Sequence, residues 1–174
     1  AKIHQNILAY SKTTEYKYSP QYQSYRQYYL ERARQDPDGR LWVDQNLGKL
    51  KKETIEKLKA EGKVFTTTTG KLRRKQYFDE MPGELIGTVM EIERINSQSK
   101  ERVGYDTQKP EKLLELFLNM FSKEGDVVAD FFIGGGTTAA VAQRYGRRWI
   151  ACDQSKIAVA VTLDRVLGVI QQQE

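Results

Sequence analysis

The clearest hydrophobic pattern lies after residue 105. Apolar residues recur at helical spacing behind Pro110, a residue favoured in the first turn of a helix, at Leu113, Leu114, Phe117, Leu118 and Phe121. Two apolar runs, residues 126–132 and 148–153, predict strands that are buried on both faces. Helices are expected after these runs, over residues 137–145 and from a capping serine at 155 to about residue 170. The order strand, glycine loop, helix, strand, helix is typical of a parallel α/β sheet.

The pattern before residue 105 is more polar and its elements are shorter. Residues 6–11 are a strand candidate, and a helix is expected from about residue 23 to residue 34. An Asp-Pro-Asp-Gly turn occupies residues 36–39. A second helix is expected over residues 51–61, and a β-branched strand over residues 64–69.

The composition restricts the class of protein. The chain has 174 residues, 39% hydrophobic and 29% charged, which suffices for one domain with a core or for one domain with a small appendage. The longest apolar run is too short to span a membrane. A single cysteine excludes an internal disulfide and fits a reducing cytoplasm. A single histidine leaves no Cys/His cluster, so no metal is expected.

The net charge of +5 is concentrated in one segment. Ten Lys and Arg side chains stand against three Glu between Lys49 and Lys75, which gives this segment +7. Such a stretch suits a polyanion, and Arg73, Arg74 and Lys75 are the phosphate-contact candidates. The alternative is a solvated surface. A tyrosine-rich stretch either stacks on bases or packs half-buried, with tyrosines at 16, 18, 22, 25, 28 and 29.

The glycine loop at residues 134–136 could hold a ligand at the start of a helix. No Gly-Lys-Ser/Thr follows, so it is not a P-loop. It satisfies the dinucleotide fingerprint, with Asp153 placed to bind a ribose. Asp130, however, precedes the loop, and a carboxylate there repels a pyrophosphate but attracts the sulfonium and amino group of S-adenosylmethionine. The alternative is that Asp130 only caps the following turn.

Ordered motifs then resemble those of one enzyme family. Three consecutive features resemble the cofactor region of bacterial site-specific DNA amino-methyltransferases. They are Thr107-Gln-Lys-Pro110, the amphipathic helix that follows it, and Asp130-x-Phe132-x-Gly134-x-Gly136-Thr137-Thr138. The resemblance extends to residues 78–83, 94–105 and 147–150, to Asp153, and to residues 6–12. It matches the permuted group, in which the target-recognition region precedes these motifs. The family acts in DNA methylation, including restriction-modification.

The resemblance implies a fold class and a division of the chain. The fold is an α/β class, an incomplete Rossmann-like S-adenosylmethionine-dependent methyltransferase sheet with a mixed α+β target-recognition region. Residues 1–15 would hold a strand from the catalytic half, residues 16–104 the DNA-binding region, and residues 105–174 the S-adenosylmethionine-binding subdomain.

The resemblance also implies roles for individual residues. Asp130, Gly134, Gly136 and Thr137 would line the methionine part of S-adenosylmethionine, and Phe132 would also belong to the cofactor site. Asp153 would bind its ribose, and Thr107 and Lys109 its carboxylate, for which a lysine is a suitable partner. The sequence departs from the family in two places, because Phe131 replaces a usual proline and Gly135 a usual serine or cysteine.

The Asp/Asn/Ser-Pro-Pro-aromatic motif that holds a flipped base in this family is absent, because no two prolines are adjacent. No catalytic residue is therefore named, and a catalytic half is expected upstream. An apolar strand with an open edge then predicts pairing with a second copy or with a separate catalytic half. The expected function is methylation of a base amine in double-stranded DNA, on adenine rather than cytosine. The alternatives are a non-catalytic DNA- or partner-binding relative and an NAD-binding oxidoreductase fragment.

Overall fold

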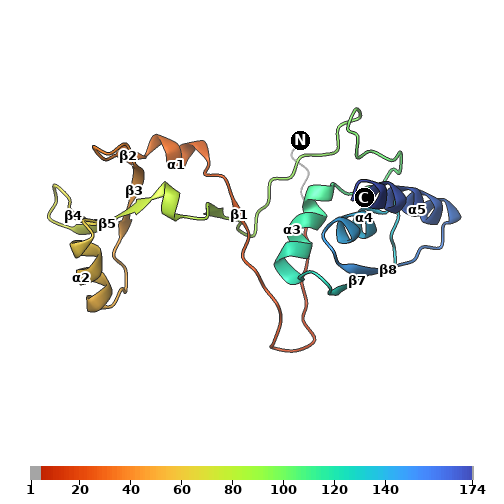
Figure 1. The fold of residues 1–174 in the computed structure, drawn as a ribbon, viewed down its shortest axis with the longest axis horizontal. Helices are drawn as coiled ribbons and strands as arrows, with labels where there is room; N and C mark the ends of the chain where they lie inside the picture. The colour runs from red at the N-terminus through yellow and green to blue at the C-terminus, as the bar shows by residue number, and fades with distance from the viewer. Residues whose placement is uncertain (1–4, 174) are drawn as a thin grey trace. The chain divides into compact units, whose positions relative to one another are not determined.

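The computed structural model describes residues 5–173, and the protein is a mixed α/β chain (Figure 1). Contacts within the chain separate residues 22–87, which we call the inserted unit, from the remaining residues, which we call the glycine-loop unit. The expected functional division at residues 16 and 105 is a different kind of boundary and stays a proposal. Among the described residues, no helix is long and apolar enough to cross a membrane.

The inserted unit is built on a four-stranded antiparallel sheet in the order β2-β3-β5-β4. These strands are β2 (Arg34–Gln35), β3 (Leu41–Asn46), β4 (Val64–Thr66) and β5 (Leu72–Tyr77). Helix α2 (Lys52–Ala60) connects β3 to β4. The flanking elements are a short pairing of β1 (Tyr22–Gln23) with β6 (Glu84–Leu85), helix α1 (Gln27–Glu31) and a 3₁₀ turn η1 (Phe78–Glu80).

A half-buried carboxylate, Asp36, organises the core of the inserted unit. Asp36 accepts hydrogen bonds from Lys75 Nζ at 2.7 Å, from the Tyr77 hydroxyl at 2.5 Å and from Trp42 Nε1 at 2.8 Å. The hydrogen bond from Lys75, followed by that from Tyr77, lowers the pKa of Asp36. Trp42 and Tyr77 are themselves buried. A polar hub of this kind ties β3 and β5 to the turn that precedes them.

The structure confirms some of the elements expected before residue 105 and corrects others. The turn at 36–39, the second helix and the start of the β-branched strand are present. The helix expected from residue 23 is wrong in extent, because α1 has only five residues and residues 22–23 pair with β6 instead. Residues 6–11 contain no strand, since no neighbouring strand among the described residues pairs with them.

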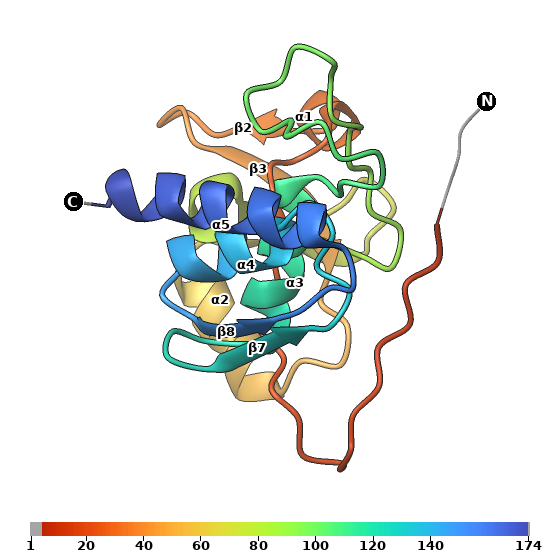
Figure 2. The same cartoon turned by 90° about the vertical axis from the view of Figure 1, so that its right-hand side faces the viewer.

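The glycine-loop unit contains two parallel strands covered by helices. Its elements are α3 (Glu111–Phe121), β7 (Val127–Asp130), α4 (Thr137–Arg144), β8 (Arg148–Ala151) and α5 (Lys156–Gln171). β7 and β8 pair in parallel, and α4 lies between these strands and α5 (Figure 2). Ser155 caps α5 as expected, because its hydroxyl accepts a hydrogen bond from the Ala158 amide at 3.4 Å.

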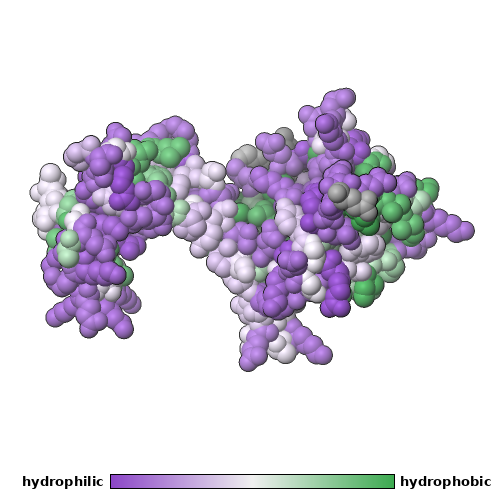
Figure 3. All heavy atoms as spheres, in the orientation of Figure 1, coloured by the Kyte–Doolittle hydropathy of each residue, from purple (hydrophilic) through white to green (hydrophobic). Residues whose placement is uncertain are grey.

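Within residues 5–173, only one face of the β7–β8 pair is covered, which corrects the expectation of strands buried on both faces. Val128 and Trp149 pack against the buried Leu118 and Val141 of α3 and α4. The alternate residues point away, so Val127 is 52% exposed and Ile150 is 57% exposed. Apolar side chains also reach the surface around α5 (Figure 3). The apolar runs were read correctly as strands, but sequence cannot tell which faces find a partner.

Candidate functional site

The loop between β7 and α4 requires glycine at its last position. Gly134 and Gly136 have φ values of +51° and +75°, in the left-handed region that other residues avoid. A Cβ on Gly136 would lie 2.9 Å from both Cα and Oγ1 of Thr162 on α5. The backbone of the loop therefore lies directly against α5, with no room for a side chain between them.

The carboxylate of Asp130 fastens this loop to the end of β7. Its Oδ1 accepts a hydrogen bond from the Phe132 amide at 3.0 Å, and its Oδ2 accepts one from the Thr138 hydroxyl at 2.7 Å. The turn-capping role that the sequence left open is thus present. Each carboxylate oxygen has a second lone pair, so capping leaves Asp130 able to face a cationic ligand as well.

A cavity of about 460 Å³ lies beside the loop, a volume that suits a small-molecule ligand. Six of the eight predicted cofactor residues line it: Thr107, Lys109, Asp130, Phe132, Gly134 and Thr137. Leu113, Leu114 and Phe117 form its apolar wall. Their helical spacing predicted a shared face, but the sequence did not place that face at the candidate site. The cavity thus combines the carboxylate of Asp130, the ammonium group of Lys109 and the backbone of the glycine loop with an apolar surface.

The other two predicted residues, Gly136 and Asp153, do not line the cavity. Asp153 follows β8 and accepts hydrogen bonds from the amides of Ser155 and Gly134, both at 2.9 Å. These two amides lower the pKa of Asp153, which keeps the carboxylate ionised. Asp153 therefore supports the loop from the side of β8, at the carboxyl ends of the two parallel strands.

A partly buried ion network behind the loop carried no sequence signal. Arg165 of α5 donates to the Gly135 carbonyl at 2.8 Å and to Glu111 Oε1 at 2.6 Å, and Glu111 Oε2 pairs with Arg144 Nη1 at 2.5 Å. Burial opposes ionisation of Glu111, but the hydrogen bonds from Arg144 and Arg165 outweigh it and lower the pKa of this carboxyl. The network joins α3, α4 and α5 around the loop.

The segment before α3 covers the loop on another side. The Tyr105 ring lies so close to Gly134 that a Cβ there would be 3.2 Å from Tyr105 Cε1. The Gln108 side chain accepts a hydrogen bond from the Val103 amide and donates one to the Glu101 carbonyl, which closes this segment on itself. The Thr137 hydroxyl then donates to the Lys109 carbonyl at 3.1 Å. The segment that carries Thr107 and Lys109 is thereby held against the loop.

The three cations predicted to contact phosphates lie on β5, and each has a partner. Arg73 pairs with Asp44 at 3.0 Å, Arg74 Nη2 donates to Gln45 at 3.0 Å, and Lys75 pairs with Asp36. All three are half-buried. Other lysines, in and just before α2, are exposed and form no ion pair with the described side chains of this unit. They are at positions 49, 51, 52 and 57.

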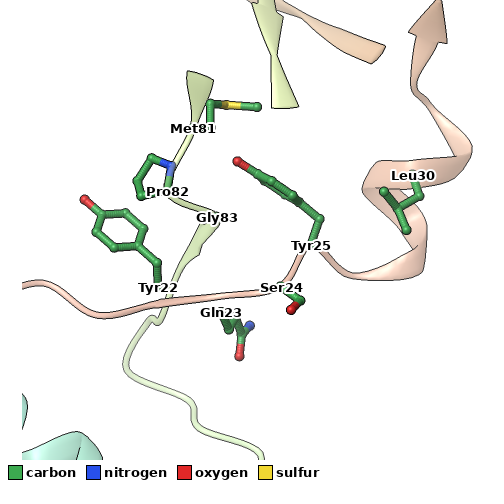
Figure 4. Close-up of a pocket in the computed structure, with 8 residues that line it drawn as sticks. All are labelled: Tyr22, Gln23, Ser24, Tyr25, Leu30, Met81, Pro82 and Gly83. Atoms are coloured by element: carbon green, nitrogen blue, oxygen red, sulfur yellow. The ribbon is translucent and has the colours of Figure 1, made fainter. Parts of the chain in front are cut away.

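The tyrosine stretch divides between packing and exposure. Tyr25 meets Phe78 edge-on, with ring centroids 4.7 Å apart, and also contacts Tyr29. Tyr22 is 44% exposed, and with Tyr25, Met81 and others it lines a shallow cavity of about 560 Å³ in the inserted unit (Figure 4).

Among residues 5–173, no three His, Cys, Asp or Glu side chains gather as a metal site requires.

Comparison with known proteins identifies relatives of one kind. A family model described as DNA methylase matches residues 1–164. Over 93 residues the chain is 34% identical to the Probable type III restriction-modification enzyme HindVI Mod subunit of Haemophilus influenzae, covering 51% of this chain and 12% of that protein. Over 62 residues it is 45% identical to Type II methyltransferase M2.DpnII of Streptococcus pneumoniae, covering 36% of this chain and 23% of that protein.

The chain thus spans less than a quarter of the length of either of these two relatives. Among solved structures, the PvuII DNA methyltransferase (cytosine-N4-specific) is 17% identical, with a TM-score of 0.42 over 79% of this chain and 70% of that one. The M1.HpyAVI complex with S-adenosylmethionine is 15% identical, with a TM-score of 0.39 over 75% of this chain and 76% of that one.

Proposed function

Because the chain belongs to the N6/N4 DNA methylase family, we propose that it is the cofactor-binding and target-recognition portion of a restriction-modification DNA amino-methyltransferase. In this proposal residues 105–174 bind S-adenosylmethionine on an incomplete Rossmann-like sheet, and residues 16–104 contact double-stranded DNA. Methyl transfer to the base amine belongs to a Pro-Pro-aromatic segment that these 174 residues do not contain. The site of action is the bacterial cytoplasm, where the DNA is.

One observation carries the cofactor assignment: Asp130 and Lys109 line the same cavity beside the glycine loop. S-adenosylmethionine bears a sulfonium and an amino group, which a carboxylate attracts, and a carboxylate, which a lysine attracts. The loop amides and the apolar wall of α3 suit its remaining surface. The residues present therefore fit this cofactor. Bound, it would supply the activated methyl group.

Calorimetry of the full chain with S-adenosylmethionine and with NAD tests this proposal. Binding of S-adenosylmethionine alone supports it. Binding of NAD instead favours an oxidoreductase fragment, for which Asp153 is suitably placed after β8. Binding of neither favours a non-catalytic relative, to which the exposed Phe131 in place of the usual proline also points.

The substitution Lys109→Met is expected to weaken S-adenosylmethionine binding about tenfold, equivalent to about 1.4 kcal/mol, because it removes the cation that faces the cofactor carboxylate. Lys112→Met is the matched control, since Lys112 is an exposed lysine in the first turn of α3 that does not line the cavity. Titration calorimetry of both variants makes the comparison. Equal affinities for the two variants would contradict the assigned role of Lys109.

For DNA, we propose that the unpaired lysines at the start of α2 contact phosphates and that Arg73, Arg74 and Lys75 chiefly hold β5 to its neighbours. The double substitution Lys51→Gln and Lys52→Gln is expected to reduce the salt dependence of DNA binding, the slope of log K against log salt, by about 2. Fluorescence anisotropy at several salt concentrations measures it. Lys59→Gln is the control, because Lys59 already pairs with Glu56 on the same helix; an equal change there would refute the proposal.

The uncovered face and open edges of the β7–β8 pair support association with further protein. We propose that this surface is covered by a second copy or by the catalytic half as a separate chain. Light scattering of the full chain at high concentration is expected to show species larger than the monomer, or a shift to them once the catalytic half is added. A compact monomer under both conditions would rule this out.

A further inference from the structure

We propose that Arg165 is a positioning residue that sets the glycine loop against the start of α3 and so fixes the two sides of the cofactor cavity. The inference rests on the proposed function, because it treats that cavity as the S-adenosylmethionine site. Arg165 lies on α5, about thirty residues after the loop in sequence, and no motif includes it. The loop conformation is thus held by a residue outside the loop.

The guanidinium of Arg165 contacts both sides at once. Nη1 donates to the Gly135 carbonyl at 2.8 Å and lies 3.1 Å from the Thr137 hydroxyl oxygen, while Nη2 donates to Glu111 at 2.6 Å. The side chain is only 7% exposed. A planar group with fixed donor directions at this depth defines the distance between its partners, which a flexible lysine would not do.

Thr137 extends this link to the cavity wall. Its hydroxyl accepts from Arg165 and donates to the Lys109 carbonyl, so one chain of hydrogen bonds runs from α5 to the residue whose side chain faces the cofactor carboxylate. Glu111 is the second residue after Lys109 and is held by the same guanidinium. Without Arg165, the loop and the Lys109 segment lose their common anchor.

Arg144 provides an internal comparison. It also pairs with Glu111, at 2.5 Å, and its side chain is 35% exposed, but neither Gly135 nor Thr137 is among its hydrogen-bond partners. Removal of either arginine therefore weakens the ion network, whereas only removal of Arg165 also removes hydrogen bonds to the loop. The two effects can be separated by experiment.

The test compares the full-length variants Arg165→Met, Arg165→Lys and Arg144→Met. Arg165→Met is expected to weaken S-adenosylmethionine binding by about 10-fold to 100-fold, because it removes the charge-assisted hydrogen bonds that join the loop to Glu111. Arg144→Met is expected to change it by less than about threefold at a comparable melting temperature. Arg165→Lys, which keeps the charge and one contact at a time, should recover part of the affinity. Hydrogen exchange of the loop amides, residues 134–138, should accelerate in Arg165→Met alone.

Equal cofactor affinity in Arg165→Met and Arg144→Met, or unchanged loop exchange in Arg165→Met, would overturn the proposal. Should Arg165→Met fail to fold, Arg165→Lys carries the same comparison with Arg144→Met. If the wild-type chain binds no S-adenosylmethionine, the proposed function fails and the cofactor role of Arg165 fails with it. Loop exchange without ligand would then still decide whether Arg165 holds the loop.

Discussion

Gly136→Ala is expected to destabilise the protein by about 2–4 kcal/mol, the sum of a left-handed backbone and an overpacked contact. The φ of Gly136 is +75°, and the new methyl group would lie 2.9 Å from the Thr162 backbone, which cannot rotate away. The loop must then move off α5, so cofactor binding should be lost as well. Urea unfolding and calorimetry measure the two effects.

Gly168→Ala is the matched control for this substitution. Gly168 also belongs to the packed helices of this unit, but it lies inside α5 with no positive φ, and a Cβ there meets nothing within 4 Å. Alanine at this position is expected to stabilise the helix by about 0.5–1 kcal/mol. A Gly136→Ala variant as stable as wild type would mean that the loop does not lie against Thr162.

Glu111→Gln is expected to cost about 2–3 kcal/mol at neutral pH, because it leaves Arg165 and Arg144 close together without their shared counter-charge. This loss of stability is smaller than that expected on breaking a fully buried ion pair, since water reaches the partly exposed Arg144. Glu115→Gln is the control, because Glu115 meets Arg144 only at 3.8 Å and does not contact Arg165. That variant should lose less than about 1 kcal/mol.

The effect of Glu111→Gln should also depend on pH. Since the folded pKa of Glu111 lies below its ordinary value of 4.5, the ionised carboxylate stabilises the fold fully above that pH. This contribution is lost as the pH falls through the lowered pKa, and glutamine cannot titrate. The stability difference between wild type and Glu111→Gln should therefore shrink in acid. Melting temperatures measured from neutral pH downward test this, and a constant difference would exclude Glu111 as the titrating group.

The sequence by itself determined the local order of the glycine-loop unit. Periodic apolar residues located α3, and two apolar runs located β7 and β8. The glycines marked the loop, and the resemblance selected residues of which six line one cavity. These features are readable because spacing within a segment decides which residues share a face, and positive φ values demand glycine locally.

Tertiary structure alone decided the pairings between segments. The strand β5 contains three consecutive cations, and its backbone pairs with β3. Asp44 and Gln45 of β3, and Asp36 in the turn before β3, bind these three cations. Residues 6–11 have strand-like composition, but no strand in the described part of the chain pairs with them. A strand needs backbone partners and a charge needs a counter-charge, and both come from distant positions. Arg165 reaches Glu111 across 54 residues for the same reason, so only the folded chain shows which cation holds the loop.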